Sequence, residues 1–273
     1  MVKLQVLICT IGVNGIKRVL ESIYPVMDDV EYLVSWQQPD DDLPIPEELA
    51  QRSDIKVYIS KNKGVCKNRN HAIACATAPI CLMTDDDVNY TAEELMSLIE
   101  AFEQNPQADI ITVKCNSIFR TKKYPDVSFN LSKSVKGYYV SCIEIAFRLS
   151  SVKNRVYFNE NISIGTPVLR CGEEDVFIYD CKCLGFNMIF VPIVVGTHNN
   201  ASTGTRDLCE PYFWMTKGAV FSYIYKYSWL PRIIVNAWRV ARERDVSMFF
   251  LIKNAIMGVG YARKNKVFPT KIG

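Results

Sequence analysis

Apolar runs alternate with helix-like segments through the first half of the chain. Five runs rich in Val, Ile and Leu predict buried strands, at 3–9, 30–36, 55–60, 79–84 and 109–115. Apolar residues recur at helical spacing between them, at 15–23, 66–78 and 91–105, and the last segment opens with TAEEL, which is typical of a helix N-terminus. This alternation predicts an α/β fold with a mostly parallel central sheet flanked by helices.

The second half of the chain divides into three parts. Residues 116–165 show short strand-like runs and polar loops whose order the pattern does not predict. A helix from about Glu173 to Leu184, ended by Gly185, precedes a strand at 186–196. After residue 207, aromatic residues mix with Lys and Arg at helical spacing, which predicts a helical extension over 208–273, with helices near 212–228, 230–244 and 247–264.

Composition indicates a globular chain whose two parts differ in charge. With 273 residues and 49% hydrophobic content, the chain can bury a sizeable core, which excludes intrinsic disorder. Residues 209–273 hold 11 Lys and Arg against 3 Asp and Glu, a net charge of +8, whereas residues 1–208 hold 21 against 26. We expect the basic extension to meet an anionic partner, either nucleic acid or phospholipid headgroups.

Several features bear on the cellular compartment. The ten cysteines lie mostly in apolar stretches, which favours buried thiols over a disulfide framework. Cys181 and Cys183 form a C-x-C with no second pair, and the chain has only two histidines, so a structural zinc site is disfavoured. The N-terminal apolar run fits a first strand better than a signal peptide, and no uncharged apolar run of about 18 residues occurs. A cytoplasmic location is predicted.

Three successive carboxylates, Asp85, Asp86 and Asp87, follow the strand predicted at 79–84. Like charges this close repel unless a cation lies among them. The carboxyl edge of a parallel sheet is where open α/β folds bind ligands, and oxygen clusters there hold Mg²⁺ or Mn²⁺ together with water and substrate phosphate. A calcium loop would need Gly and Glu where Tyr90 and Met96 stand. An acidic loop that caps the following helix is the remaining alternative.

Basic residues precede this strand in the segment NKGVCKNRNHAI (62–73). Lys63, Lys67 and Arg69 surround Gly64, which permits a tight turn immediately before a helix. A helix entry of this kind offers backbone N–H groups and cations to an anionic ligand. The alternative is a solvated charged face.

Four motifs together resemble family 2 glycosyltransferases of the GT-A fold: VLICTIG, GVCKNRNHAI, TDDDV and GEEDVF. The resemblance covers residues 3 to about 204 and extends to bacterial members that build cell-surface polysaccharides. It implies a Rossmann-like catalytic domain over 1–207, with a nucleotide-sugar half at about 1–115 and an acceptor half at about 116–207. The implied reaction is inverting transfer from a nucleotide diphosphate sugar, with a UDP-sugar expected, to a hydroxyl of a glycan or lipid-linked acceptor.

The resemblance also implies roles for individual residues. Asp85 and Asp87 would bind the Mn²⁺ or Mg²⁺ that bridges the diphosphate, and His198 would supply a third protein ligand, although a lone histidine is often structural. His71, inside a predicted helix, is expected to pack or hydrogen-bond. The implied nucleotide-sugar contacts are Thr10, Gln37, Gly64, Lys67, Arg69, Asn70, Asp85 and Asp86.

An inverting transfer needs a carboxylate to accept the proton of the acceptor hydroxyl. In the segment GEEDVF, matching the family pattern on Gly172 and Phe177 places Glu174 at the base position, whereas matching on the Glu-Asp pair alone selects Asp175. We favour Glu174, because that match uses more residues. The other alternative is a helix N-terminus enriched in acids. The segment FNENISIGT (158–166) resembles the part of the family fold that shapes the acceptor pocket.

Two other functions compete with this interpretation. Sugar-nucleotide pyrophosphorylases would need a glycine-rich, arginine-containing loop after the first strand, and CTIGVNGIKR (9–18) fits that poorly. A nucleic-acid-binding module would leave the aspartate triplet without a role, so no nucleic-acid partner is expected. The aromatic and basic extension suits an amphipathic surface in the headgroup layer at the inner face of an anionic membrane, or else a helical cap that buries its aromatic residues.

Overall fold

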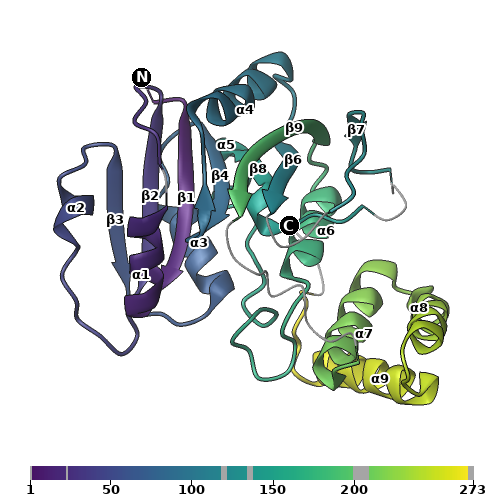
Figure 1. Ribbon diagram of the computed structural model, residues 1–273. Helices are drawn as coiled ribbons and strands as arrows, with labels where there is room; N and C mark the ends of the chain where they lie inside the picture. The colour runs from purple at the N-terminus through teal and green to yellow at the C-terminus, as the bar shows by residue number, and fades with distance from the viewer. Residues whose placement is uncertain (1, 23, 118–121, 134–137, 199–208, 270–273) are drawn as a thin grey trace. The chain divides into compact units, whose positions relative to one another are not determined.

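The computed structural model describes residues 2–22, 24–117, 122–133, 138–198 and 209–269 (Figure 1). The chain forms two compact units. The sheet unit comprises Met1–Lys63, Lys67–Tyr157 and Cys181–Ser202, and the helical unit comprises Gly64–Cys66, Phe158–Asp180 and Thr203–Gly273. This division differs from the linear one at residue 207, because Phe158–Asp180 group with the C-terminal helices. The functional division into 1–207 and 208–273 stays a prediction.

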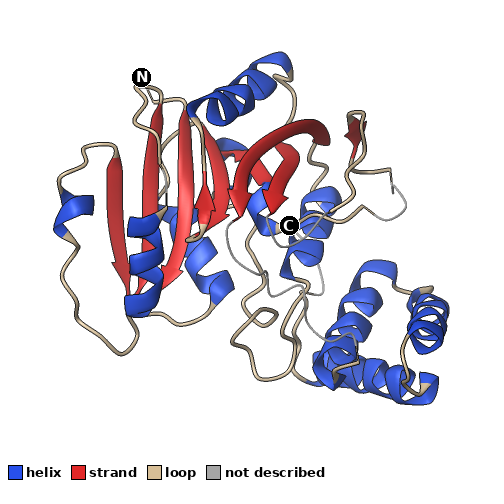
Figure 2. Ribbon diagram, viewed as in Figure 1, coloured by secondary structure: helices blue, strands red, loops and turns tan. Residues whose placement is uncertain are grey.

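The described strands of the sheet unit form one nine-stranded sheet (Figure 2). The strand order is β3-β2-β1-β4-β8-β6-β9-β5, and β7 pairs with β9. The long pairings, β1 with β2 and β4, β2 with β3, and β6 with β9, are parallel, whereas the pairings of β8, β5 and β7 are short and antiparallel. The strands are β1 (Leu4–Ile11), β2 (Val30–Gln37), β3 (Ile55–Ser60), β4 (Ile80–Asp85), β5 (Val88–Asn89), β6 (Ile110–Ser117), β7 (Phe129–Asn130), β8 (Ile145–Arg148) and β9 (Met188–His198).

Helices connect and flank these strands. The helix α4 begins with a capping box in which the Thr91 hydroxyl accepts from the Glu94 backbone N–H and the Glu94 carboxylate accepts from the Thr91 N–H. Residues of α3 and α6 belong to both units. The helices up to this point are α1 (Gly12–Glu21), α2 (Glu47–Ala50), α3 (Val65–Cys75), α4 (Ala92–Gln104), α5 (Leu149–Val152) and α6 (Glu173–Cys183), with a short 3₁₀ turn at Cys142–Glu144.

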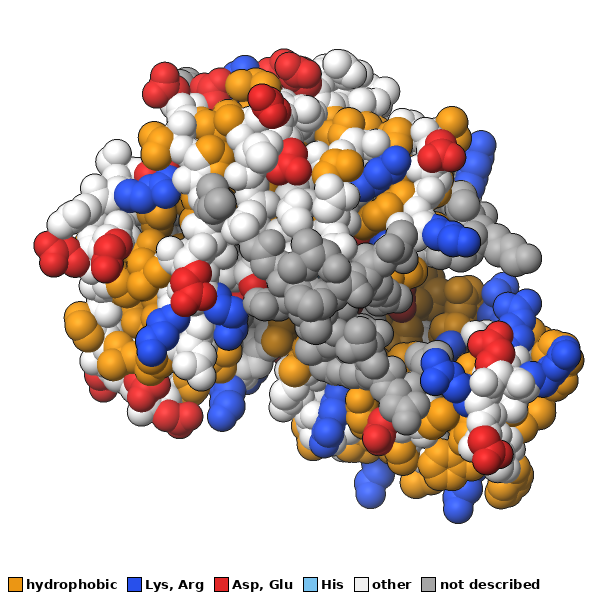
Figure 3. Space-filling view, in the orientation of Figure 1, with side chains coloured by type: hydrophobic (Ala, Val, Ile, Leu, Met, Phe, Trp, Pro, Cys, Tyr) orange, Lys and Arg blue, Asp and Glu red, His pale blue; other side chains and the backbone are white. Residues whose placement is uncertain are grey.

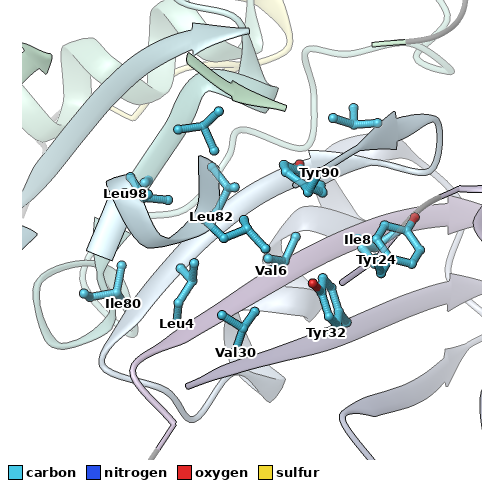
Figure 4. Packing of buried hydrophobic residues seen from close by; sticks show 14 of the residues in the cluster. Leu4, Val6, Ile8, Tyr24, Val30, Tyr32, Ile80, Leu82, Tyr90 and Leu98 are labelled. Carbon is cyan, nitrogen blue, oxygen red and sulfur yellow. The ribbon is translucent and has the colours of Figure 1, made fainter. Parts of the chain in front are cut away.

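A continuous apolar cluster holds the parallel half of the sheet together (Figure 4). Each of β1, β2 and β4 contributes side chains from one face, and α4 covers them with its buried residues, among them Leu98. Because burying one Leu, Ile or Val side chain contributes about 1.5–3 kcal/mol, this cluster is the main force that keeps the three strands in place. The labelled members on the strands are Leu4, Val6, Ile8, Val30, Tyr32, Ile80 and Leu82.

The helical unit is built on three C-terminal helices, α7 (Pro211–Tyr225), α8 (Trp229–Glu243) and α9 (Met248–Lys264). A Cβ atom on Gly218 of α7 would lie 2.1 Å from the backbone oxygen of Ala255, and one on Gly258 of α9 would lie 1.8 Å from that of Met215. Glycine therefore lets the two backbones cross in direct contact. No helix within the described residues is long and apolar enough to cross a membrane.

Most predicted elements are confirmed by the structure. The strand expected at 55–60 is β3, and the helix expected to begin after Thr91 is α4. Thiols of five cysteines are buried, as their apolar surroundings predict: Cys66, Cys81, Cys115, Cys142 and Cys181. Residues 116–165, which the pattern could not order, supply β8, and this strand lies between β4 and β6 near the centre of the sheet.

Candidate active site

The carboxyl end of β4 lies beside the end of β1. In the parallel register Cys9 is opposite Asp85, so Thr10 of β1 lies level with the residue that follows β4, Asp86. The Thr10 hydroxyl donates to Asp86 Oδ2 at 2.5 Å. The strands thus bring together two positions that are 76 residues apart in the sequence.

The cation that balances Asp86 is a residue of the protein. Arg18 of α1 donates from Nε to Asp86 Oδ1 at 2.8 Å and from Nη2 to Oδ2 at 2.9 Å, which makes a bidentate pair. Asp86 is 6% exposed. Both carboxylate oxygens are therefore engaged inside the fold, and the predicted contact of Asp86 with the nucleotide stays a prediction.

Gly15 allows α1 to approach this pair. A Cβ atom at position 15 would lie 2.1 Å from the Thr10 hydroxyl and 3.0 Å from Asp86 Oδ2. Glycine is the one residue that leaves room for the Arg18–Asp86–Thr10 arrangement at this point. The segment CTIGVNGIKR (9–18) thus packs against Asp86 through Thr10, Gly15 and Arg18.

Asp87 and His198, two of the predicted metal ligands, lie side by side. The short antiparallel pairing of β5 with β9 sets Val88 opposite His198, and His198 Nε2 lies 3.2 Å from Asp87 Oδ1. Gly196, with φ of +86°, permits the approach, because a Cβ atom there would lie 2.8 Å from Tyr90 Cε1. Both side chains are largely buried.

The third carboxylate, Asp85, lies near a buried arginine. Arg69 Nη2 of α3 is 3.7 Å from Asp85 Oδ1, and the Arg69 side chain is 5% exposed whereas that of Asp85 is 43% exposed. A guanidinium held inside the protein at the edge of an open carboxylate provides positive charge close to the place where an anionic ligand would bind.

Neighbouring residues of α3 fix this helix against β1 and β2. The Asn68 amide donates to the backbone oxygens of Thr10 (2.9 Å) and Ser35 (3.0 Å), and Asn68 Oδ1 accepts from the Ser35 hydroxyl (2.6 Å). The same hydroxyl lies 2.7 Å from His71 Nδ1, and burial lowers the pKa of His71. The structural role expected for His71 agrees with these contacts.

The other residues predicted to bind the nucleotide sugar differ in burial and in the element that carries them. Gln37 is buried at the end of β2, opposite Ile11 of β1. Gly64 has a φ of +127°, which suits the tight turn predicted before α3, and Lys67 is exposed on the first turn of that helix. Asn70 is half-buried. The structure thus places Thr10, Gln37, Arg69 and the aspartates in the sheet unit, whereas Gly64 belongs to the helical unit.

The side chains fit a metal ion that a substrate helps to hold. Among the residues described, no three His, Cys, Asp or Glu side chains gather closely enough to form a complete cage. Mg²⁺ and related ions commonly use one or two carboxylates and take their other ligands from phosphate and water. The adjacent oxygen of Asp87 and nitrogen of His198 are suitable donors for such an ion.

The candidate bases lie in the first turn of α6, within the helical unit. Glu173 is buried, Glu174 is half-buried and Asp175 reaches solvent. Loss of hydration among the surrounding protein atoms raises the pKa of Asp175 to about 6, the negative charge of Glu174 adds to the rise, and the positive charge of Lys217 opposes it. Asp175 is therefore ionised at neutral pH but much more basic than an ordinary aspartate.

Lys217 of α7 is held in an unusual environment, which the sequence did not single out. Its ammonium donates to Asn236 Oδ1 at 3.0 Å and lies 5.3 Å from the centre of the Trp214 ring, with Phe213 and Phe221 at similar distances. Burial lowers the pKa of Lys217, whereas Asp175 raises it. Aromatic rings thus hold a cation near the candidate base.

A second carboxylate of α6 is also strongly perturbed. Asp180 is buried and accepts a hydrogen bond of 2.8 Å from the Tyr223 hydroxyl. Burial raises the pKa of Asp180 to about 6, and the hydrogen bond works in the opposite direction. No sequence signal distinguishes this aspartate from a solvated helix residue.

The helical unit also contains an open cavity of about 470 Å³. The lining includes Ile164, Gly165 and Thr166, which belong to the segment predicted to shape the acceptor pocket. Arg170 and Tyr212 complete it, with the guanidinium carbon 5.4 Å from the ring centre. The predicted segment thus lines a cavity large enough for a small ligand.

Several solved structures share this fold. The crystal structure of S. aureus TarS residues 1–349 in complex with UDP-GlcNAc aligns with a TM-score of 0.60 and 14% identity, covering 96% of this chain and 92% of that one. The corresponding UDP complex gives a TM-score of 0.57 at 15% identity, with the same coverage. A longer S. aureus TarS structure gives 0.56 at 17%, and the match spans only 39% of its length and 80% of this chain.

Comparison of the sequence with family models identifies the family of this chain, whereas comparison with curated proteins does not. No curated protein sequence matched the chain. The model of glycosyl transferase family 2 matches residues 8–170, which is more than half of the chain and contains the end of β1, the strands β2 to β8, the aspartate triplet and the segment before α6. The match agrees with the GT-A fold of the structural neighbours and confirms the resemblance inferred from the four motifs. The chain therefore belongs to glycosyl transferase family 2.

Proposed function

We propose that this glycosyltransferase moves a sugar, with inversion, from a UDP-sugar to a hydroxyl of a glycan or lipid-linked acceptor. Family membership supports the reaction class. The structures of S. aureus TarS with UDP-GlcNAc and with UDP share the fold, which supports a uridine nucleotide donor. The observation that carries the proposal is the contact between Asp87 and His198 at the carboxyl edge of β4.

Asp85, Asp87 and His198 are the proposed protein ligands of a Mn²⁺ or Mg²⁺ ion, and of these Asp87 and His198 already lie within 3.2 Å of each other. Such an ion, when bound, neutralises the negative charge that builds on the departing diphosphate. Arg18 fixes Asp86 and so orders the loop that carries both flanking aspartates. Arg69 adds a second positive charge at the same edge, 3.7 Å from Asp85.

The nucleotide-sugar contacts follow from the family resemblance and the placement of the strands. Thr10 and Gln37 end neighbouring parallel strands, where ligands of open α/β sheets bind. Arg69 and Asn70, in the first half of α3, would face the nucleotide. The residues proposed to bind the nucleotide-sugar donor are Thr10, Gln37, Gly64, Lys67, Arg69, Asn70, Asp85 and Asp86.

We propose Asp175 as the general base in place of Glu174, which the match on Gly172 and Phe177 favours, and keep Glu174 as the alternative. The carboxylate would accept the proton of the acceptor hydroxyl while that oxygen attacks the anomeric carbon and the bond to the diphosphate breaks on the opposite face. An efficient base has a pKa near the working pH, and the pKa of Asp175 of about 6 meets this condition.

Calorimetric titration of UDP with and without Mn²⁺ tests the donor site. We expect Mn²⁺ to tighten UDP binding by about tenfold or more, equivalent to about 1.4 kcal/mol, and Asp87→Asn to remove that gain. Asp28→Asn is the matched control, because Asp28 is exposed and precedes β2, at the amino edge of the same sheet. The proposal fails if the wild-type chain binds no UDP under either condition, or if Asp87→Asn keeps the full effect of Mn²⁺.

A further inference from the structure

The C-terminal helices expose large apolar side chains beside basic ones. The helix α8 presents Leu230, Ile234 and Trp238 at intervals of four residues, so the three lie on one face of the helix. Their exposed fractions are 37%, 39% and 49%. Arg242 continues the row, and its guanidinium carbon lies 4.8 Å from the centre of the Trp238 ring. The row is therefore an amphipathic surface stripe rather than a buried helix face.

The helix α9 repeats the pattern on its own outer face. Phe249 is 75% exposed, Ile256 50% and Met257 49%, while Lys253 and Lys264 are exposed on the same side of the helix. The opposite side packs inward with the buried residues Leu251, Asn254, Ala255, Gly258, Val259 and Ala262. Figure 3 shows hydrophobic and basic side chains interspersed over this part of the molecule.

Charge on this part of the chain is almost entirely positive. Residues 209–273 contain 11 Lys and Arg and only three acids, Glu210, Glu243 and Asp245. A cavity of about 480 Å³ between α7 and α8 is lined in part by Arg232 and Arg239. The helices α8 and α9 therefore carry both exposed apolar side chains and basic side chains that attract anions.

We propose that the outer faces of α8 and α9 dock on an anionic lipid surface, with Trp238 and Phe249 among the acyl chains and the Lys and Arg side chains at the phosphates. Helices that lie in a membrane interface combine Trp, Phe and Leu on one side with Lys and Arg at the rim, which is the combination present here. Each Lys or Arg near such a surface adds attraction to anionic headgroups.

Two other occupants fit less well. A second copy of the chain would bring two surfaces of charge +8 together, and like charges oppose that contact. A nucleic acid would neutralise the basic residues, and its bases could stack on Phe249, but it would leave the aliphatic side chains of Leu230 and Ile234 without an apolar partner. The lipid surface satisfies both kinds of side chain. This inference goes beyond the proposed transfer reaction and does not depend on it.

Tryptophan fluorescence of the full chain tests the docking surface directly. Of the four tryptophans, Trp36 and Trp214 are buried, Trp229 is half-buried and Trp238 is exposed. On vesicles of phosphatidylcholine with phosphatidylglycerol, we expect the emission to shift to shorter wavelength and brominated acyl chains to quench it. Trp238→Phe should abolish most of the shift while the protein still floats with the vesicles.

Flotation of further variants measures the contributions of apolar and basic groups. We expect the double substitution of Trp238→Ser and Phe249→Ser to weaken vesicle binding by about tenfold or more. Lys253→Gln should weaken it by about fivefold, because one interfacial charge is lost. Val26→Ser is the matched control, since Val26 is 78% exposed but lies in the sheet unit, and it should bind vesicles as the wild type does.

Three results would overturn the inference: no flotation of the wild type with anionic vesicles at low salt, equal binding to vesicles of phosphatidylcholine alone, or full binding by the double serine variant. Calorimetry with UDP on the same proteins separates this outcome from the transfer proposal. Vesicle binding without UDP binding would contradict the proposed donor site and support the docking surface. UDP binding without vesicle binding would support the donor site and contradict the docking surface.

Discussion

The two units of this glycosyltransferase hold their candidate carboxylates in different ways. In the sheet unit, Asp86 has both oxygens bonded to Arg18 and Thr10, so a guanidinium and a hydroxyl hold this side chain in place. In the helical unit, Asp180 is buried and Asp175 is exposed at its surface but surrounded by protein atoms, and loss of hydration raises the pKa of each to about 6. The same residue type is therefore paired with a cation in one unit and has a raised pKa in the other.

The secondary structure explains this difference. Parallel strands end at a common edge, where α1 and α3 bring arginines and hydroxyls close to the carboxylates. The helix α6 instead meets α7, whose aromatic residues offer few hydrogen-bond donors and displace water. The Arg18–Asp86 pair fixes the loop that carries the aspartates, whereas a carboxylate whose pKa lies near the working pH suits proton transfer.

The largest effect should come from removing the titratable charge at position 175. We expect Asp175→Asn to lower turnover by about 10²–10⁴-fold, since general base catalysis contributes that much, while UDP binds unchanged. In the wild type, turnover should rise with pH through about 6 and then level off, because only the ionised carboxylate accepts a proton. Initial rates from about pH 5 to about pH 8 measure both effects.

Glu174→Gln is the matched control for this prediction. If Asp175 is the base, the variant should keep the rise of turnover with pH, with its midpoint moved to lower pH, because the neighbouring negative charge is gone. Lys217→Met should move the midpoint the other way, since Lys217 favours the ionised form of Asp175. Loss of turnover in Glu174→Gln, with activity retained in Asp175→Asn, would transfer the base role to Glu174.

A smaller effect, on stability, should follow from breaking the fixed pair in the sheet unit. Removing one partner of a fully buried ion pair costs about 3–5 kcal/mol. The Arg18 side chain is 38% exposed, so water screens part of the charge left on Asp86, and we expect Arg18→Met to lower the free energy of unfolding by about 2 kcal/mol. Urea denaturation at neutral pH measures the change.

Lys3→Met provides the comparison for a pair that water already surrounds. Lys3 donates to Glu103 at 2.9 Å, but the two side chains are 46% and 56% exposed. Such pairs contribute about 0–1 kcal/mol, so the substitution should change stability little. Equal losses in Arg18→Met and Lys3→Met would mean that the Asp86 pair has no special role in ordering the aspartate loop.

Local sequence patterns predicted the elements of the sheet unit well because their causes are local. Continuous apolar runs form β1 to β4, and the Thr91–Glu94 capping box starts α4 where the TAEEL motif indicates. The strands β5 and β8 escaped prediction because they have two and four residues, too few for a periodic pattern. Their positions depend on pairing with β9 and with β4 and β6, which distant parts of the chain decide.

The candidate site shows the same limit. The sequence predicted that Asp87 and His198 lie together, because each comes shortly after a predicted strand and the family resemblance implies that they share a metal ion. The Arg18–Asp86 pair could not, because it spans 68 residues and depends on how α1 crosses the end of β4. The raised pKa of Asp180 was equally hidden, since a lone aspartate in a helix pattern gives no sign of burial.

Asp180 offers the prediction with the clearest pH dependence. Its pKa is about 6 in the folded protein and about 3.9 in the unfolded chain, so the folded state binds more protons between these values. Stability should therefore fall as pH rises from about 4 to about 6, and the penalty should persist above that. Asp180→Asn keeps an oxygen that can accept from Tyr223 but removes the charge, so it should raise the free energy of unfolding by up to about 3 kcal/mol at pH 7.5, which is the value of a shift of about two pKa units, and leave it nearly unchanged near pH 4. Urea denaturation of both proteins at the two pH values measures this difference. If Asp180→Asn were instead less stable at pH 7.5, the ionised carboxylate would be stabilised by its surroundings, and the contrast between the two units would be confined to Asp175.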